Sequence, residues 1–102
     1  MPKVSAVVIT YNGKRHLKEC FESLARQTYK DFDAYMLDNG STDGSSEFVK
    51  EKFPWVKIIR FDKNYGFAEG YNRAIKIIHS NYIALLNDDT KADPKWLEEL
   101  VK

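Results

Sequence analysis

Hydrophobic and polar residues form an alternating series of strand-like and helix-like patterns along the chain. Short apolar runs rich in β-branched residues predict four strands, at 4–9, 33–38, 56–61 and 82–86. Apolar residues that recur every three or four positions predict helices at 15–27, at 67–79 and after Pro94. Turn residues after the second strand open a shorter helix that ends at Lys52. This order predicts an α/β fold with an open, mostly parallel sheet of about four strands, right-handed crossovers and flanking helices.

Some of these segments also carry clues to their place in the sheet. The run at 82–86 is mostly apolar, which is typical of a parallel strand buried on both faces. The run at 56–61 contains a lysine and an arginine, which favour the edge of the sheet. The helix at 67–79 is expected to face the sheet through an apolar stripe made of Phe67, Tyr71, Ile75 and Ile78, with Ala68 and Ala74 permitting close approach.

The composition allows one domain and excludes several classes of protein. Of 102 residues, 43% are hydrophobic and 14% aromatic, which is enough for a core. The net charge of +1 argues against a protein that binds nucleic acid through its overall field. The single cysteine, Cys20, excludes an intrachain disulfide and is expected in the core. No apolar run approaches the roughly 18 residues of a membrane span. We therefore expect a soluble, cytoplasmic protein that could act at the inner face of the membrane.

Every predicted strand is followed by polar residues that could bind a ligand. These are Thr10, Tyr11 and Asn12, then Asp38 and Asn39, then Asp62 and Asn64, and finally Asn87, Asp88 and Asp89. Because the carboxyl ends of parallel strands lie on one rim of a sheet, we expect these side chains to converge. Such a rim suits a nucleotide, with Mg²⁺ or Mn²⁺ binding its diphosphate. Polar residues also end strands for structural reasons alone, since Asn and Asp are typical of turns and helix caps, and the pattern leaves that interpretation open.

Several common catalytic and nucleotide-binding motifs are absent from the sequence. No Gly-x-x-x-x-Gly-Lys-Ser/Thr motif supports a P-loop enzyme, and no Gly-x-Gly-x-x-Gly follows the first strand. The chain also lacks a serine nucleophile elbow. A phospho-acceptor domain would need an acidic pair after the first strand, where this chain has Thr10, Tyr11 and Asn12. Any phosphate charge is therefore expected to be met by a metal ion.

Four motifs, in order and covering nearly the whole chain, resemble those of the nucleotide-binding half of family 2 glycosyltransferases. They are the segments Val7–Asn12, Leu37–Ser45, Asn64–Asn72 and Leu85–Thr90. The resemblance implies the Rossmann-like GT-A fold. It also implies inverting transfer of a sugar from a nucleoside-diphosphate sugar donor to a glycan or lipid-linked acceptor.

The resemblance assigns roles to individual residues. It implies that the donor is bound by Thr10, Tyr11, Asn12, Asp38, Asn39, Asn64, Gly66, Asn72, Asn87 and Asp88. The Asp-x-Asp metal motif of the family aligns with Asn87-Asp88-Asp89, so Asp89 is the expected ligand of the divalent metal and Asp88 would lie nearer the sugar or ribose. Asn87 departs from the family pattern and weakens coordination by two carboxylates. Many relatives carry arginine where Tyr71 stands, and the Gly70-Tyr71-Asn72 version resembles the rhamnosyl- and galactofuranosyl-type branch instead.

The resemblance places the catalytic base beyond Lys102, where the sequence stops within a predicted helix. We therefore expect the natural protein to be longer, and we expect these residues to bind the donor weakly without transferring the sugar. A four-stranded sheet also has unprotected edges, so a second copy of the chain could cover one of them. The alternative function is a non-catalytic nucleotide-binding or interaction module.

Overall fold

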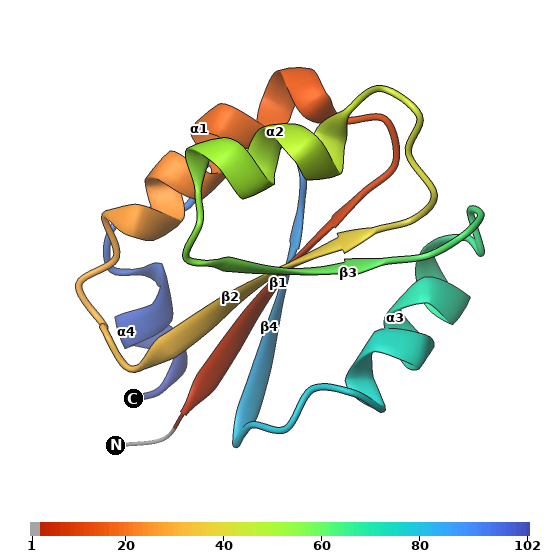
Figure 1. Cartoon of the computed structure of the whole chain (residues 1–102). Coiled ribbons are helices and arrows are strands. Elements are labelled where there is room, and N and C mark those ends of the chain that lie inside the picture. Colours follow the sequence, from red (N-terminus) through yellow and green to blue (C-terminus); the bar gives the residue numbers. More distant parts are fainter. Residues whose placement is uncertain (1–2) are drawn as a thin grey trace.

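The computed structural model describes residues 3–102 as one parallel four-stranded sheet with helices on both faces (Figure 1). In chain order, the elements are β1 (Val4–Thr10), α1 (Lys14–Ala25), β2 (Phe32–Asp38), α2 (Ser45–Lys52), β3 (Val56–Arg60), α3 (Phe67–Ile75), β4 (Tyr82–Asn87) and α4 (Trp96–Leu100). The strands lie in the order β3-β2-β1-β4, and every neighbouring pair is parallel. The predicted fold class is confirmed. None of the helices in residues 3–102 has the length and apolar character needed to cross a bilayer.

The two faces of the sheet are covered by different helices (Figure 1). On one face, Val8 and Met36 contact a core formed by α1 and α2, which includes Phe21 and Val49. On the other face, Val7 and its neighbours pack against α3. The short helix α4 packs through Leu97 near the start of β1. Because side chains of a strand alternate between faces, each strand supplies both cores.

The fully buried strand is β1 rather than β4. All seven residues of β1 are buried, since it lies between β2 and β4 and between two helical layers. In β4, only Ala84 and Leu86 are buried, and Tyr82 is 54% exposed. The prediction that the run at 82–86 is buried on both faces was therefore wrong. Within residues 3–102, β4 pairs only with β1 and is an edge strand. The position of β3 at the opposite edge is confirmed.

Helix α3 is shorter than predicted, and its predicted sheet-facing stripe is confirmed only in part. It ends at Ile75 instead of His79, and its buried residues are Gly70 and Ala74. Phe67, which was predicted to face the sheet, is 54% exposed. Gly70 approaches the loop after β2 closely, because a β-carbon there would lie 3.1 Å from the side-chain nitrogen of Asn39. The close approach predicted at Ala74 is confirmed, and Tyr71 and Ile78 of the predicted stripe also pack in the core on this face.

We expect Phe21→Ala to lower the free energy of unfolding by about 3–5 kcal/mol. The Phe21 ring is fully buried and lies 5.6 Å from the ring of Phe53. The matched control is Phe67→Ala, which should cost less than about 1 kcal/mol because that ring is exposed. Urea denaturation measures both values. Similar losses for the two variants would contradict the orientation of α3.

Candidate functional site

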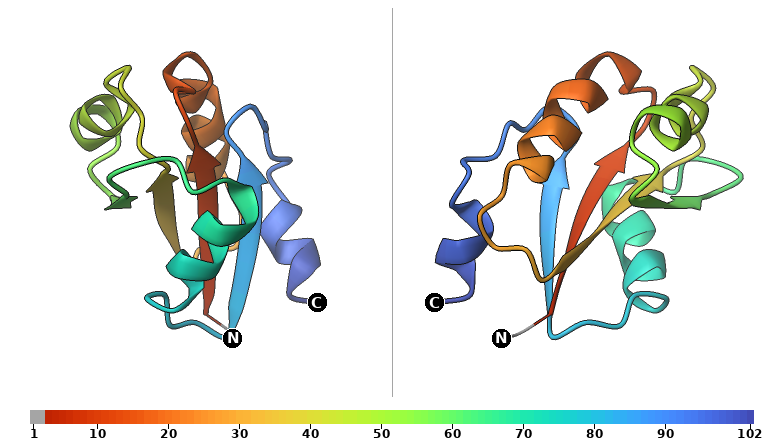
Figure 2. Two further views of the ribbon diagram at one scale, coloured as in Figure 1. Left: turned by 90° about the vertical axis from the view of Figure 1, so that its right-hand side faces the viewer. Right: turned by 60° about the vertical axis from the view of Figure 1, so that its left-hand side comes forward.

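The ends of the strands meet at one rim of the sheet (Figure 2). In the strand register, Thr10 lies beside Asp38, and Ile9 lies beside Asn87. Thr10 Oγ1 donates a hydrogen bond of 2.8 Å to Asp88 Oδ2, which joins residues 78 positions apart. The backbone N–H of Asn39 donates to the Thr10 carbonyl at 2.9 Å. The expected convergence of polar strand ends is therefore present for β1, β2 and β4.

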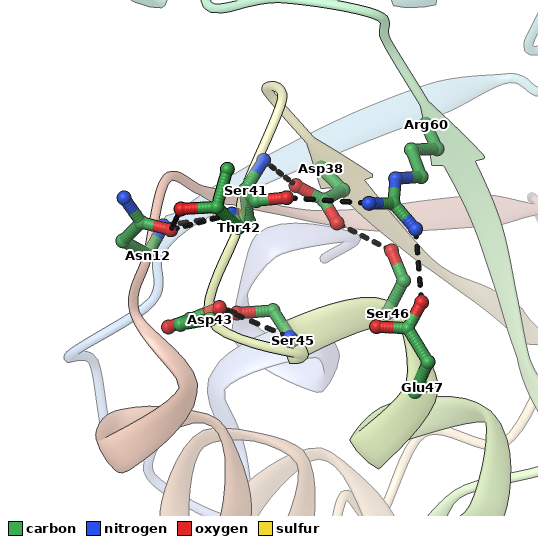
Figure 3. Close-up of polar contacts among 9 residues, drawn as sticks. All are labelled: Asn12, Asp38, Ser41, Thr42, Asp43, Ser45, Ser46, Glu47 and Arg60. Atoms are coloured by element: carbon green, nitrogen blue, oxygen red, sulfur yellow. Dashed lines mark hydrogen bonds and ion pairs between the residues drawn. The ribbon is translucent and has the colours of Figure 1, made fainter.

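Asp38 is fully buried and holds the loop that follows β2 (Figure 3). Its Oδ1 accepts a hydrogen bond from the backbone N–H of Ser41 at 2.8 Å, and its Oδ2 accepts one from the hydroxyl of Ser46. Arg60 donates to the Ser41 carbonyl at 3.2 Å and also pairs with Glu47. Both carboxylate oxygens of Asp38 thus accept hydrogen bonds within the protein, and these bonds fix the backbone of the loop at the rim.

The loop after β1 is tied to the same segment (Figure 3). Asn12 has a left-handed backbone, with φ of 54°. Its side-chain oxygen accepts a hydrogen bond from the N–H of Thr42 at 2.8 Å, and its own N–H donates to Ser41 Oγ at 2.8 Å. Its neighbour Tyr11 is 51% exposed. The loop is therefore held by Asn12, while the ring of Tyr11 remains open to a ligand.

Asn39 connects the rim to the loop that follows β3. Its side-chain nitrogen donates to the Gly66 carbonyl at 2.9 Å, and its side-chain oxygen accepts from the N–H of Tyr65 at 3.0 Å. Asn64 closes this loop, because its side-chain oxygen accepts from the N–H of Gly66 at 2.7 Å. Asn72 lies apart from these contacts. It is exposed and lines an open groove of about 650 Å³, together with Phe61 after β3 and with Glu69 and Arg73 of α3.

The turn after β4 carries two carboxylates with different surroundings. Asp88 is half-buried and accepts the hydrogen bond from Thr10. Asp89 is exposed, and none of residues 3–102 donates a hydrogen bond to its carboxylate. Asn87 is also exposed. The side chains that remain available to a ligand at this end of β4 are therefore Asn87 and Asp89.

The oxygen atoms of this turn suit a hard divalent cation that is only partly coordinated by protein. Residues 3–102 contain no group of three His, Cys, Asp or Glu side chains that could hold a metal ion. An ion at Asp89 would need further oxygen ligands from a substrate and water. Mg²⁺ is commonly bound in this way, through one or two carboxylates and substrate phosphates. The donor set thus fits the expected Mg²⁺ or Mn²⁺.

Cys20 lies in α1 beneath this turn and is buried, as predicted. Its thiol is 3.9 Å from the carbonyl oxygen of Asn87. Burial raises the pKa of this thiol to about 12, and the negative charges of Asp88 and Asp89 act in the same direction. The group is therefore a neutral core residue near the site and not a nucleophile.

Three contributors to the site were missed by sequence reasoning. Gly13 leaves the space into which the carboxylate of Asp88 fits. Arg60 holds the loop after β2 by a hydrogen bond to the Ser41 carbonyl, whereas the sequence pattern predicts only that its charge favours an edge strand. Gln27 is fully buried and bonds to the segment after the acidic turn. A glutamine at the end of an amphipathic helix is a weak sequence signal for such a contact, whereas the glycine at position 13 gives no signal.

Comparison with known sequences relates the chain to one family. The model of a family described as glycosyl transferase family 2 matches residues 5–102. An uncharacterized glycosyltransferase of Methanocaldococcus jannaschii is 39% identical over 99% of this chain and 37% of its own length. The chondroitin synthase of Escherichia coli is 30% identical over 96% of this chain and 15% of its own length. The chain thus spans little more than a third of these relatives at most.

Solved structures share the fold. A mannosyltransferase from Pyrobaculum calidifontis, in complex with GDP-Man and Mn²⁺, superposes with a TM-score of 0.79 and 23% identity, covering 86% of this chain and 28% of that one. S. aureus TarS 1-349 in complex with UDP superposes with a TM-score of 0.86 and 24% identity, covering 97% of this chain and 31% of that one. These similarities establish the GT-A arrangement of strands and helices.

Cys20 in the folded chain should react slowly with iodoacetamide through pH 9, because only the thiolate is nucleophilic and the pKa is raised to about 12 from an ordinary value of 9.0. The unfolded chain releases this proton first, so the same pKa difference lowers stability as the pH rises from 9.0 toward about 12. Alkylation rates with and without urea measure the effect. Equal rates would contradict it.

We expect Gly40→Ala to destabilise the chain more than Gly44→Ala. Both glycines have positive φ, of +82° and +85°, so an L-residue costs about 1–2 kcal/mol at either position. Only at Gly40 would the new β-carbon meet backbone, 2.6 Å from the carbonyl carbon of Lys63, whereas at Gly44 the nearest atom is Lys14 Nζ at 3.7 Å. Urea denaturation compares the two. Equal losses would disprove the close packing of the loops after β2 and β3.

Proposed function

Because this chain belongs to glycosyl transferase family 2, we propose that it forms the part of an inverting glycosyltransferase that binds a nucleoside-diphosphate sugar. The observation that carries the proposal is the exposed carboxylate of Asp89 at a rim of ordered polar loops. Support also comes from the two similar structures solved with GDP-Man and Mn²⁺ and with UDP. The acceptor would be a glycan or a lipid-linked sugar.

In this proposal, the donor lies across the ends of β1, β2 and β4. Tyr11 is the residue best suited to stack on the base, because its ring is half exposed beside a fixed loop. Asp38 and Asn39 stand beside the base and ribose, and their internal hydrogen bonds keep the surrounding backbone in place. A binding surface that is ordered in advance loses little entropy when the donor binds. The remaining donor contacts are assigned to Thr10, Asn12, Asn64, Gly66, Asn72, Asn87 and Asp88.

Asp89 is proposed to hold a divalent cation, Mg²⁺ or Mn²⁺, against the diphosphate. When bound, the cation would supply Lewis-acid stabilisation of the charge that develops on the departing nucleoside diphosphate. The exposed position of Asp89 leaves room for phosphate and water oxygens. Asn87, beside it, offers an amide that can contact the phosphate or sugar without adding negative charge.

Inverting transfer also needs a base that removes the proton of the acceptor hydroxyl. We assign no residue of this chain to that role, and we propose that the base is supplied by residues that follow Lys102 in a longer protein. The chain by itself would then bind the donor weakly and transfer no sugar. Robust transfer to an acceptor by these 102 residues would be inconsistent with this division.

Titration calorimetry with UDP, GDP and dTDP, each with and without Mn²⁺, tests the proposal. We expect at least one nucleotide to bind, and to bind more tightly with Mn²⁺. Asp89→Ala should abolish the gain from Mn²⁺ while changing the free energy of unfolding by less than about 1 kcal/mol, because the side chain is exposed.

The matched control is Glu51→Ala, which removes an exposed acid from α2 and should leave the Mn²⁺ effect unchanged. Persistence of the Mn²⁺ effect in Asp89→Ala would rule out Asp89 as the metal ligand. Absence of heat with every nucleotide would rule out the proposed function and favour an interaction module.

A further inference from the structure

We propose that α1 sets the position of the metal-binding turn, and that Gly13 and Gln27 are its positioning residues. This inference rests on the proposed function, because it assumes that Asp89 binds the metal. It concerns two residues that touch neither metal nor donor. Gly13 precedes α1 and Gln27 follows it, so the two lie at opposite ends of one helix.

The front anchor is the contact between Gly13 and Asp88. A β-carbon at Gly13 would lie 1.9 Å from Asp88 Oδ2 and 2.5 Å from Thr10 Oγ1. The Gly13 backbone has φ of −102° and ψ of 21°, which any residue can adopt, so glycine serves here for space and not for conformation. The carboxylate of Asp88 fits into that space and accepts the hydrogen bond from Thr10. The positive end of the α1 dipole also favours a negative charge there.

The back anchor is made by two side chains near the end of α1. Gln27 is fully buried; its Nε2 donates to the Asp93 carbonyl at 2.7 Å, and its Oε1 accepts from the N–H of Leu97 at 3.0 Å. Ser23 Oγ accepts from the N–H of Ala92 at 3.0 Å. Figure 2 shows the segment after β4 running beside α1. Three hydrogen bonds therefore hold this segment to the last turn of α1 and to the residue that follows its cap.

Asp89 lies on the short stretch between the two anchors. Asp88 is fixed in front of it, and Ala92 is fixed behind it. The turn is closed by a hydrogen bond of 3.1 Å from the N–H of Thr90 to the Asn87 carbonyl. Because the backbone on both sides is held, Asp89 can project into solvent from a rigid turn. A ligand presented in this way binds a metal with little loss of conformational freedom.

The test compares Gly13→Ala and Gln27→Met with Thr28→Val. Gly13→Ala should displace the carboxylate of Asp88, and Gln27→Met removes the hydrogen bonds to Asp93 and Leu97 at nearly unchanged volume. The control Thr28→Val removes an exposed side-chain bond to the Pro94 carbonyl, while the backbone N–H of Thr28 still bonds to that carbonyl at 2.9 Å. The control thus alters the same contact region without releasing the turn.

Mn²⁺ alone is the probe, and its affinity is measured from the paramagnetic broadening of the amide signals of residues 87–91. We expect Gly13→Ala and Gln27→Met each to weaken Mn²⁺ binding about tenfold, as for other residues that orient a metal ligand, and Thr28→Val to change it less than about twofold. Hydrogen exchange at Ala92 and Leu97 should accelerate in Gln27→Met. Only variants that unfold cooperatively are compared, so if Gln27→Met fails to fold, Gly13→Ala decides the result.

Mn²⁺ affinity that is unchanged in folded Gly13→Ala would overturn the inference and leave the proposed function standing. A loss of stability in these variants without a loss of Mn²⁺ affinity would have the same meaning, because it indicates a structural role only. Absence of Mn²⁺ broadening in the unmodified chain, both with Mn²⁺ alone and with UDP added to supply the diphosphate oxygens, would instead overturn the metal role of Asp89, and the positioning role with it.

Discussion

The pairing of β1 with strands on both sides is the constraint on which the rest of the structure depends. It buries all seven residues of β1 and aligns the ends of β2 and β4 with its own end. Parallel pairing cannot be satisfied by a tight hairpin, so β1, β2 and β3 are each joined to the next strand by a loop and a crossover helix. The polar residues that end these strands are thereby brought together from positions nearly 80 residues apart.

The gathering of polar side chains at the strand ends has a physical consequence for the site. Buried polar groups need partners, and residues 3–102 contain no buried side-chain nitrogen or oxygen without one. Asp38 and Asn39 therefore bind neighbouring loops, and the rim is held by its own side chains. The groups left free are the exposed ones, such as Tyr11 and Asp89. The site thus divides into residues that build a rigid frame and residues that face a ligand.

Helix α1 extends this division to the turn after β4. It covers one face of the sheet through its apolar side, and its two ends contact the segment that contains the acidic residues. One element therefore serves both the core and the site. These contacts account for the glycine just before the helix and for the buried glutamine just after it.

The sequence by itself determined the order of elements, the parallel sheet and the family. These follow from local periodicity and from motifs whose residues are close together, such as Asn87-Asp88-Asp89. Only the tertiary structure decided that β4 is an edge strand, that Gly70 packs against Asn39 while Phe67 is exposed, and that Asp88 turns inward while Asp89 faces solvent. The physical reason is that burial depends on neighbours distant in sequence. The local sequence pattern does not tell which of two adjacent carboxylates is buried, and the two differ in burial because Gly13 makes room for Asp88.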